Sequence, residues 1–387
     1  MENKIVFLKY DQVNTALNFL RKFGKSINSN YINKNYFLDF FKIKKSSISK
    51  CKIILKNNRV IGFRGGFESK FSYSFQKKNY IFKGKENLLW FCLSKNIKEN
   101  LNLLQEKKSY KFLTSTGFGL TRKFYEKNDF KFINLIRYIK PLNIKEYKKI
   151  SKKKKFINFK EKEFFSKITA LKPQKIKSIE LEKIWKKILS EVNILSRFRD
   201  RNFWSWRYEN CKYYRYIYWK CPSNSGAVVG RVEKILDKKI KKNNLQLLRI
   251  IEILPCSNKI WNGKKDITFQ NFLKSILKWC DERKFLAVDF YISGNFFDKF
   301  LKSAGFFKST KKNTEFQSFP SIFKPLNYKK RHINITFKIN LNNNILNNKK
   351  IVRYFVKSDG GGDFPPTDFT KKDIKSLNKI NLKYINE

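Results

Sequence analysis

The sequence predicts a mixed α/β protein built from two tandem domains, each a mixed, mostly antiparallel sheet flanked by helices. Its 387 residues exceed what one ordinary core accommodates, so two domains are expected. Similar strings also recur in the same order: YFLDFFK at 36–42 is matched by NFWSWRY at 202–208, and RYIKPL at 137–142 by SIFKPL at 321–326. Landmarks that recur in order at near-equal spacing indicate a tandem duplication.

The repeated landmarks divide the chain into four parts. We expect an N-terminal domain over residues 1–144, a Lys-rich linker over 145–179, a C-terminal domain over 180–330 and an extension over 331–387 that is partly loop. The linker, with KEYKKISKKKKFINFKEKE, shows little periodicity and is predicted to be solvated. In the extension, VKSDGGGDFPPTDF at 356–369 predicts a mobile turn, because no strand-to-helix context frames it as a phosphate site.

Patterns typical of strands and of helices follow one another along the first half. The segments CKIIL and VIGFRGGF flank the turn KNNR and predict a hairpin. The apolar string ENLLWFCLS predicts a third, buried strand. The remaining predicted elements are a short helix at 96–105, a strand at 110–116, a helix at 121–128 and a final strand at 130–139.

The second half repeats this order. Predicted strands cover 213–221, 227–235, 245–254 and 285–293, with the turn PSNS between the first two. A long helix precedes the last of these strands. Its apolar residues recur every three or four positions: Phe269, Phe272, Leu273, Ile276, Leu277 and Cys280. Asp266 or Thr268 can cap this helix at its N-terminus.

The composition limits the partners and the chemistry. The net charge of +55 is extreme, but Lys is spread almost evenly, so a solvated surface is the simplest interpretation and nucleic-acid binding is less favoured. The six cysteines contain no CxxC pair and His332 is the single histidine, so we expect reduced thiols and no metal site. Neither a secretory leader nor a run of 18 apolar residues is evident, and we expect a soluble, cytoplasmic protein.

The order of elements, with a helix that ends in a YxKxGF-like string before the final strand, resembles the GNAT family of acyl-CoA N-acyltransferases, present here twice. The resemblance covers about residues 1–142 and 180–326. It is greatest to tandem GNAT-like proteins of surface-polysaccharide and sugar-modification pathways, whose second halves carry FxxWRY before a tyrosine-rich strand, as NFWSWRY and YYRYIYW do here. Acetyl-CoA or another acyl-CoA is then the implied co-substrate.

In the family, a loop of the form R/Q-x-x-G-x-G/A after the fourth strand holds the CoA pyrophosphate through backbone N–H groups. The matching stretch of the first half, LSKNIKENL, has no glycine, whereas LPCSNKIWNGKKDITF of the second half has one glycine and two lysines before a helix. The second half is therefore favoured as the phosphate site. The residues that the resemblance assigns to donor binding are Ser94, Lys95, Asn96, Leu254, Cys256, Gly263, Lys264 and Lys265.

The resemblance also implies two catalytic residues. Tyr125 in KFYEKNDF matches the family tyrosine that protonates the departing thiolate, although Asp129 stands where the family has glycine and the second half has Leu301 at the tyrosine position. Glu252 within RIIEIL matches a base on the fourth strand, and burial among apolar residues raises a carboxyl pKa. The alternatives are a half-buried Tyr125 that closes its helix, and a Glu252 paired with Arg249 or with a helix lysine.

Aromatic and arginine residues gather between 197 and 219, whereas arginine is otherwise scarce beside lysine. Arg207, Tyr208 and Tyr216 are the expected substrate-binding residues, because rings and guanidinium groups suit a sugar and its phosphate. The alternative interpretation is an amphipathic helix that docks Trp204 and Tyr208 on the core.

Together these features predict an enzyme, an acyltransferase of the N-acetyltransferase kind, that moves an acyl group from acyl-CoA to an amino group of a small molecule. An amino sugar, free or linked to a nucleotide, is the expected acceptor. Two alternatives keep the fold. A Fem-like aminoacyl transferase would use aminoacyl-tRNA, a polyanion suited to the basic surface, and a non-catalytic binding protein would have lost both donor sites.

Overall fold

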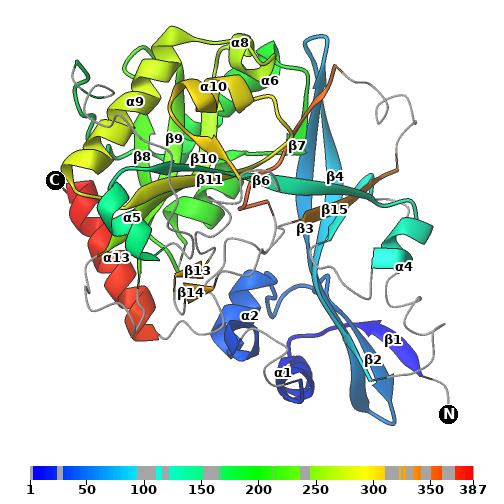
Figure 1. The fold of residues 1–387 in the computed structure, drawn as a ribbon. Helices are drawn as coiled ribbons and strands as arrows, with labels where there is room; N and C mark the ends of the chain where they lie inside the picture. Colours follow the sequence, from blue (N-terminus) through cyan, green and yellow to red (C-terminus); the bar gives the residue numbers. More distant parts are fainter. Residues whose placement is uncertain are drawn as a thin grey trace.

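One mixed sheet passes through the whole molecule, with its strands in the order β1-β2-β3-β4-β5-β15-β6-β11-β10-β9-β8 (Figure 1). We call residues 3–150 the N-terminal half, 165–309 the C-terminal half and 322–386 the C-terminal segment. The computed structural model describes residues 3–23, 29–93, 110–115, 122–150, 165, 167–211, 213–235, 245–309, 322–323, 326–327, 334–340, 350–359 and 371–386. Among these residues, no helix has the length and apolar character needed to cross a bilayer.

The N-terminal half is dominated by a long hairpin. Its elements are β1 (Lys4–Phe7), α1 (Val13–Arg21), η2 (Ser29–Ile32), α2 (Lys34–Phe40), β2 (Lys52–Lys56), β3 (Arg59–Phe75), β4 (Lys78–Cys92), β5 (Phe112–Ser115), α4 (Arg122–Lys127), β6 (Lys131–Pro141) and α5 (Ile144–Ile150). The predicted hairpin is present as β2 and β3, which pair on either side of Asn57 and Asn58. Strands β3 and β4 form a second, longer hairpin that was not predicted and pair as far as Phe75 and Lys78. Turn residues Gln76 and Lys77 both have positive φ, as a type I′ hairpin turn requires. The predicted helix at 96–105 lies outside the described residues.

Helices α1 and α2 cover one face of this hairpin. Helix α1 buries Val13, Ala16, Leu17 and Leu20, which lie on one side of the helix at spacings of three and four. Helix α2 starts at Asn33, whose side chain accepts a hydrogen bond from the Tyr36 N–H at 3.2 Å. Both helices pack on apolar side chains of β2, β3 and β4 in one core cluster.

The C-terminal half follows the predicted order of strands and helices. Its elements are α6 (Ser178–Glu191), β7 (Ile194–Arg197), α7 (Arg201–Trp204), the π-helical turn η4 (Ser205–Glu209), β8 (Ile217–Lys220), β9 (Gly226–Lys234), β10 (Gln246–Pro255), α8 (Asn258–Trp261), α9 (Ile267–Glu282), β11 (Ala287–Ser293), α10 (Asp298–Ser303) and β12 (Phe307–Lys308). Strand β7 pairs with β3 of the long hairpin, which belongs to the N-terminal half.

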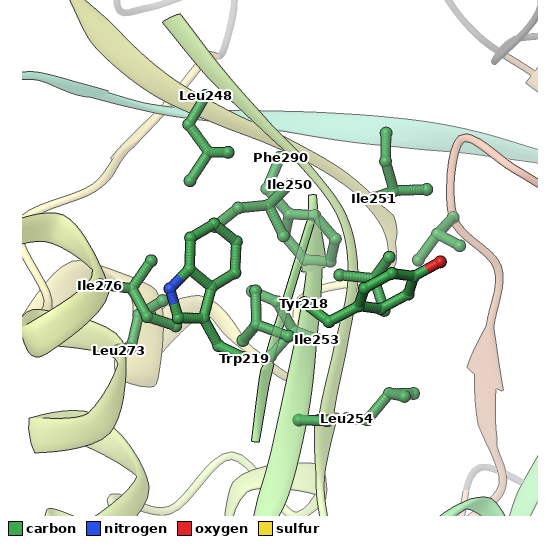
Figure 2. Packing of buried hydrophobic residues seen from close by; sticks show 14 of the residues in the cluster. Tyr218, Trp219, Leu248, Ile250, Ile251, Ile253, Leu254, Leu273, Ile276 and Phe290 are labelled. Carbon is green, nitrogen blue, oxygen red and sulfur yellow. The ribbon is translucent and has the colours of Figure 1, made fainter. Parts of the chain in front are cut away.

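The predicted long helix is α9, and it supplies much of the core of the C-terminal half. All six apolar positions that predicted it are buried. Asp266 caps the helix by accepting a hydrogen bond from the Phe269 N–H at 3.0 Å. Figure 2 shows the Trp219 indole of β8 beside Leu273 and Ile276 of this helix, over the side chains of β10.

Strand β6 joins the two halves into one sheet. Its second part pairs with β11 from Leu135 to Pro141, and its first part pairs with β15 of the C-terminal segment. The chain then forms helix α5 where a solvated linker was expected, so that prediction was wrong for residues 145–150. Tyr147 and Ile150, three positions apart, are buried, and the Asn143 side chain accepts a hydrogen bond from the Glu146 N–H at 3.1 Å.

The C-terminal segment adds further elements to both halves. They are β13 (Ile322–Phe323), β14 (Leu326–Asn327), β15 (Asn334–Ile339), β16 (Val352–Tyr354) and α13 (Lys371–Asn386). Strand β15 lies between β5 and β6, β16 runs parallel to β7, and α13 packs on β8 and β9. The mobile turn expected at 356–369 is wrong where the structure describes it, because Lys357, Ser358 and Asp359 are buried.

Candidate functional site

Strands β4 and β5 are parallel neighbours in the N-terminal half. The pairs that the structure describes run from Gly84 with Phe112 to Asn87 with Ser115. Strand β4 continues to Cys92, paired with β3 on its other side. A register shift between Gly65 and Gly66 falls at the same point. Within the described residues, β4 therefore has no β5 partner beyond Asn87.

The bulge at this point has a direct structural consequence. Gly66 pairs with Asn87 and Gly65 with Leu89, so Leu88 has no partner in the register of either neighbouring strand within the described residues. A bulge releases a residue from the ladder and re-aims its backbone groups. Leu88 thus lies outside the ladder at the end of the described β4–β5 pairing.

The C-terminal half repeats this arrangement of strands. Strand β10 runs parallel to β11 only as far as Ile250, which pairs with Phe290. The register of β10 with β9 then shifts between Ile250 and Glu252. Strands β10 and β11 continue to Pro255 and Ser293 beyond the shift.

In the C-terminal half, however, the chain itself occupies the space beyond the bulge. Val356 forms a bridge with Ile292 of β11, and the Ser293 N–H donates to the Phe355 carbonyl at 2.9 Å. The Tyr354 hydroxyl crosses to β10, where it donates to the Ile253 carbonyl at 3.1 Å. The segment from Tyr354 to Val356 therefore bridges the two strands beyond the bulge.

Glu252 lies at the centre of the network that holds this segment. It is fully buried on β10, and its Oε1 accepts hydrogen bonds from Arg199, Tyr208 and Ser358 at 3.1, 2.7 and 3.1 Å. Its Oε2 accepts from the Tyr354 hydroxyl at 2.7 Å. Burial raises the pKa of Glu252, and the Arg199 guanidinium opposes that rise.

Arg199 connects Glu252 to a second carboxylate of the C-terminal segment. Its Nη2 lies 2.6 Å from Asp359 Oδ2, and its Nε lies 3.1 Å from Glu252. Arg199 itself is completely buried. One guanidinium thus contacts two buried carboxylates and offsets part of the cost of burying their charge.

Tyr125 lies apart from this network, beside the end of β5 in the N-terminal half. It is buried on α4, and its hydroxyl lies 2.7 Å from Ser115 Oγ, at the last paired residue of β5. Its ring meets Phe130 edge-on at 4.9 Å. The hydroxyl therefore lies beside the last described residue of β5, and the assignment of Tyr125 as an acid stays a prediction.

The helix end after Tyr125 explains the departure from glycine. Asp129 adopts φ 60°, the left-handed region, and the Phe130 N–H donates to the Tyr125 carbonyl at 3.0 Å. In the C-terminal half, Gly305 adopts φ 79° at the corresponding place before Phe306. Asp tolerates this conformation better than most side chains, so both helices close in the same way.

The other predicted donor residues lie around the end of β10. Leu254 and Cys256 are buried, and the Cys256 N–H donates to the Ser225 carbonyl at 2.8 Å. Gly263 has φ 71°, and its N–H and that of Lys264 close helix α8, while Lys265 is exposed. Ser94, Lys95 and Asn96 lie outside the described residues.

The three predicted substrate-binding residues come together around η4 and β8. Arg207, Tyr208 and Tyr216 are all buried. The Tyr208 and Tyr216 rings meet edge-on at 4.9 Å, and Tyr208 also donates to Glu252. These side chains therefore belong to the packed interior around Glu252, and Tyr125 is the one predicted catalytic residue outside it.

A cavity between the halves was not foreseen from the sequence. It has a volume of about 520 Å³, within the range of small-molecule sites. Its wall contains Lys42, Glu68, Ser69, Lys70, Ile81, Phe82, Lys83, Arg197, Phe198, Asp200, Asn202, Phe203 and Trp206. The residues come from the end of α2, the long hairpin, β7 and the turn of α7 and η4. Because they are far apart in sequence, no local pattern signals the cavity.

A buried ion pair stands beside this cavity. Arg197 Nε lies 2.9 Å from Glu86 Oε1, and both side chains are buried. Burial raises the pKa of Glu86, and Arg197 acts against the rise. The Arg197 guanidinium also faces the rings of Phe203 and Trp206 at 4.6 and 5.3 Å. Glu86 lies on β4, two residues before the bulge residue Leu88.

No family model matches the sequence, and no curated protein matches it. Among solved structures, an Enterococcus faecalis protein of unknown function, described as a probable N-acyltransferase, is similar with a TM-score of 0.51 at 8% identity, over 88% of this chain and 73% of that chain. A GCN5-related N-acetyltransferase from Anabaena variabilis has a TM-score of 0.49 at 10% identity, over 88% and 73%. Saccharomyces cerevisiae N-myristoyltransferase with bound myristoyl-CoA has 0.47 at 10% identity, over 87% and 80%. The predicted fold class, a mixed α/β fold of the GNAT type, is confirmed.

Proposed function

We propose that the protein is an N-acyltransferase that moves an acyl group, in the first place acetyl, from acyl-CoA to an amino group of a small molecule such as an amino sugar. The observation that carries the proposal is the Tyr125 hydroxyl beside Ser115, where the described pairing of β4 with β5 ends at a bulge of β4. The likeness in fold to a protein described as a probable N-acyltransferase supports it.

The acyl donor enters the N-terminal half. In the C-terminal half, Tyr354, Phe355 and Val356 contact both strands where the pair separates. Among the described residues of the N-terminal half, no segment makes a corresponding bridge between β4 and β5. Half-buried apolar residues follow the bulge on β4, and Leu93 after them is 51% exposed. This wall suits the apolar part of a pantetheine arm and its acyl group.

Acyl-CoA supplies a thioester. The residues at the end of the described β4–β5 pairing supply a proton donor and a group that stabilises the carbonyl oxygen. The amine nitrogen attacks the carbonyl carbon, the C–N bond forms, and the C–S bond then breaks. The Tyr125 hydroxyl gives its proton to the departing thiolate and, after CoA leaves, regains one from solvent through Ser115. The peptide group of Leu88, released from the ladder, is suited to stabilise the carbonyl oxygen as it gains charge. The proton of the amine passes to water.

The two halves descend from one duplicated unit. In each half the parallel pair ends at the residue before a bulge, at Asn87 and at Ile250. A residue with left-handed φ then closes the following helix in both halves, Asp129 in one and Gly305 in the other. The copies have since diverged: the N-terminal one keeps the tyrosine, and in the C-terminal one Glu252 anchors the C-terminal segment.

Incubation with acetyl-CoA and a panel of small amines tests the proposal. We expect release of free CoA thiol together with an acetylated amine, identified by its mass. Product mass is needed because a lysine-rich protein can itself react with a thioester, and that reaction also releases thiol. Absence of acetylated amine for every acceptor, together with absence of acetyl-CoA binding, would reject the enzyme proposal.

A further inference from the structure

The cavity between the halves has an uneven balance of charge. Three of its lysine and arginine side chains have a carboxylate partner: Lys70 with Asp200 at 3.1 Å, Lys83 with Glu68 at 3.1 Å, and Arg197 with Glu86 at 2.9 Å. The fourth is Lys42. No carboxylate of the described residues lies within ion-pair distance of its ammonium group. One positive charge at the cavity wall is therefore in excess.

Lys42 is held in place by backbone and by rings. It follows helix α2 with φ 53°, the left-handed conformation that closes a helix, and the next N–H, of Ile43, donates to the Leu38 carbonyl at 2.8 Å. Its Nζ lies 4.3 Å from the centre of the Trp206 ring and 5.2 Å from that of Phe67. The backbone thus fixes the base of this side chain, and the rings fix its charged end.

The surroundings of Lys42 lower its affinity for a proton. Its pKa is lowered to about 8, first because the protein around the cavity displaces bulk water and second because of the positive charge of Arg197. Lys44 acts in the same direction, whereas Glu86 and Asp200 oppose it. Solvent still reaches the side chain, because it lines an open cavity. An anion beside Lys42 would supply the negatively charged partner that the described residues do not provide.

The rest of the wall favours a compact ligand with an apolar body. Phe82, Phe198, Phe203 and Trp206 contribute rings, and the volume of about 520 Å³ suits a molecule of metabolite size. The carboxylates of Glu68 and Asp200 line the same cavity, and each is already paired with a lysine. An ammonium group of the ligand would share or replace these lysine contacts, so the wall combines one anion-binding point with two carboxylates.

From this arrangement we infer that the cavity binds the acceptor, and that the acceptor is an amine that also carries one anionic group, a carboxylate or a phosphate ester, held by Lys42. The inference rests on the proposed function in one respect, that the bound amine is the group to be acylated. Binding itself does not depend on it, because the cavity, its charges and its rings are properties of the free protein.

Two matched pairs of probes test the inference by isothermal titration calorimetry in the absence of any acyl-CoA. Glucosamine 6-phosphate is compared with glucosamine, and phenylalanine with phenethylamine, so that each pair differs by the anionic group alone. We expect the member of one pair that carries the anionic group to bind the wild-type protein at least tenfold more tightly than the member that lacks it. The pair that responds distinguishes a phosphate acceptor from a carboxylate acceptor. Equal binding within both pairs, or no binding of either anionic member, would overturn the inference.

Variants at Lys42 locate the binding. K42M should abolish the preference for the anionic member, whereas K34M, on the exposed surface of the same helix, should leave it unchanged. Raising the pH from 7 to 9 removes the Lys42 charge from most molecules, so affinity of the wild-type protein should fall by about tenfold. K42R keeps its charge at both pH values and should bind with much weaker pH dependence. A preference that survives in K42M would contradict the assignment.

These experiments separate failure of the inference from failure of the proposed function. Loss of anion-selective binding with intact thiol release and amine acetylation would remove the assigned acceptor class and leave the acyltransferase standing. Anion-selective binding that depends on Lys42 in a protein without acyl transfer would establish the cavity as a ligand site and reject the proposed reaction.

Discussion

Replacing Tyr125 by phenylalanine is expected to lower kcat for acetyl transfer by roughly a hundredfold or more, the usual contribution of a general acid. The change removes the hydroxyl that contacts Ser115 Oγ at 2.7 Å, while the ring can keep its edge-on contact with Phe130. The reaction would then lose the proton donor for the departing thiolate. Steady-state kinetics with product detection by mass measures the effect.

A matched control is Tyr80→Phe, because Tyr80 lies next to the turn of the long hairpin and its side chain is 45% exposed. It should retain wild-type kcat. Urea unfolding of the Tyr125→Phe protein should confirm that it remains folded. A folded Tyr125→Phe enzyme with wild-type kcat would show that Tyr125 only packs the end of α4.

Replacing Arg199 by methionine is expected to reduce the free energy of unfolding by about 3–5 kcal/mol, because removing one partner of a buried ion pair leaves uncompensated charge. In this protein the loss is shared by two carboxylates, Glu252 and Asp359, which both contact the Arg199 guanidinium. Equilibrium urea unfolding at pH 7 measures the change. Arg201→Met is the control, since Arg201 is exposed and should have little effect.

The pH dependence of the Arg199→Met protein gives a second readout. The pKa of Glu252 is already raised by burial, and Arg199 is the group that most opposes the rise. Without Arg199, protonation of Glu252 is favoured in the folded state, so lowering the pH should recover part of the lost stability relative to the wild type. A loss below about 1 kcal/mol at pH 7, or one that grows as the pH is lowered, would contradict the proposed role of Arg199.

Local patterns in the sequence predicted much of the fold. The six apolar positions of α9 and its Asp266 cap lie as expected, because a helix buries one face whatever surrounds it. The strands β8, β9, β10 and β11 also match their apolar segments. Such patterns could not predict which strands pair when they are far apart in the sequence. Strand β15 lies between β5 and β6, although its residues are more than 190 positions away from either strand.

The candidate site also contains some residues that a local pattern predicted and others that it did not. Tyr125 was identified from a short string at a helix end, and the structure places its hydroxyl at the end of β5. Glu252 was also correctly expected to be buried, but its partners come from two distant parts of the chain, Arg199 from one and Tyr354 and Ser358 from the other. Nothing local in the sequence indicates that the C-terminal segment would reach β10.

The cavity shows why the remaining residues were missed. Lys42 is one lysine among many, and only its position after α2 brings it beside Trp206. Glu86 was counted with an apolar strand, yet its pairing with Arg197 depends on β7 joining the long hairpin. Both features arise from contacts between the halves, so they require the three-dimensional structure.

The central claim is that acyl-CoA enters the N-terminal half between β4 and β5. Hydrogen exchange of the backbone amides, with and without acetyl-CoA, tests it most directly, because both halves carry the same strand arrangement and serve as each other's control. We predict slower exchange at residues 88–92 and 112–115 on addition of acetyl-CoA, with no change at 251–256. Protection at 251–256 in place of 88–92, or no protection in either half, would contradict the account.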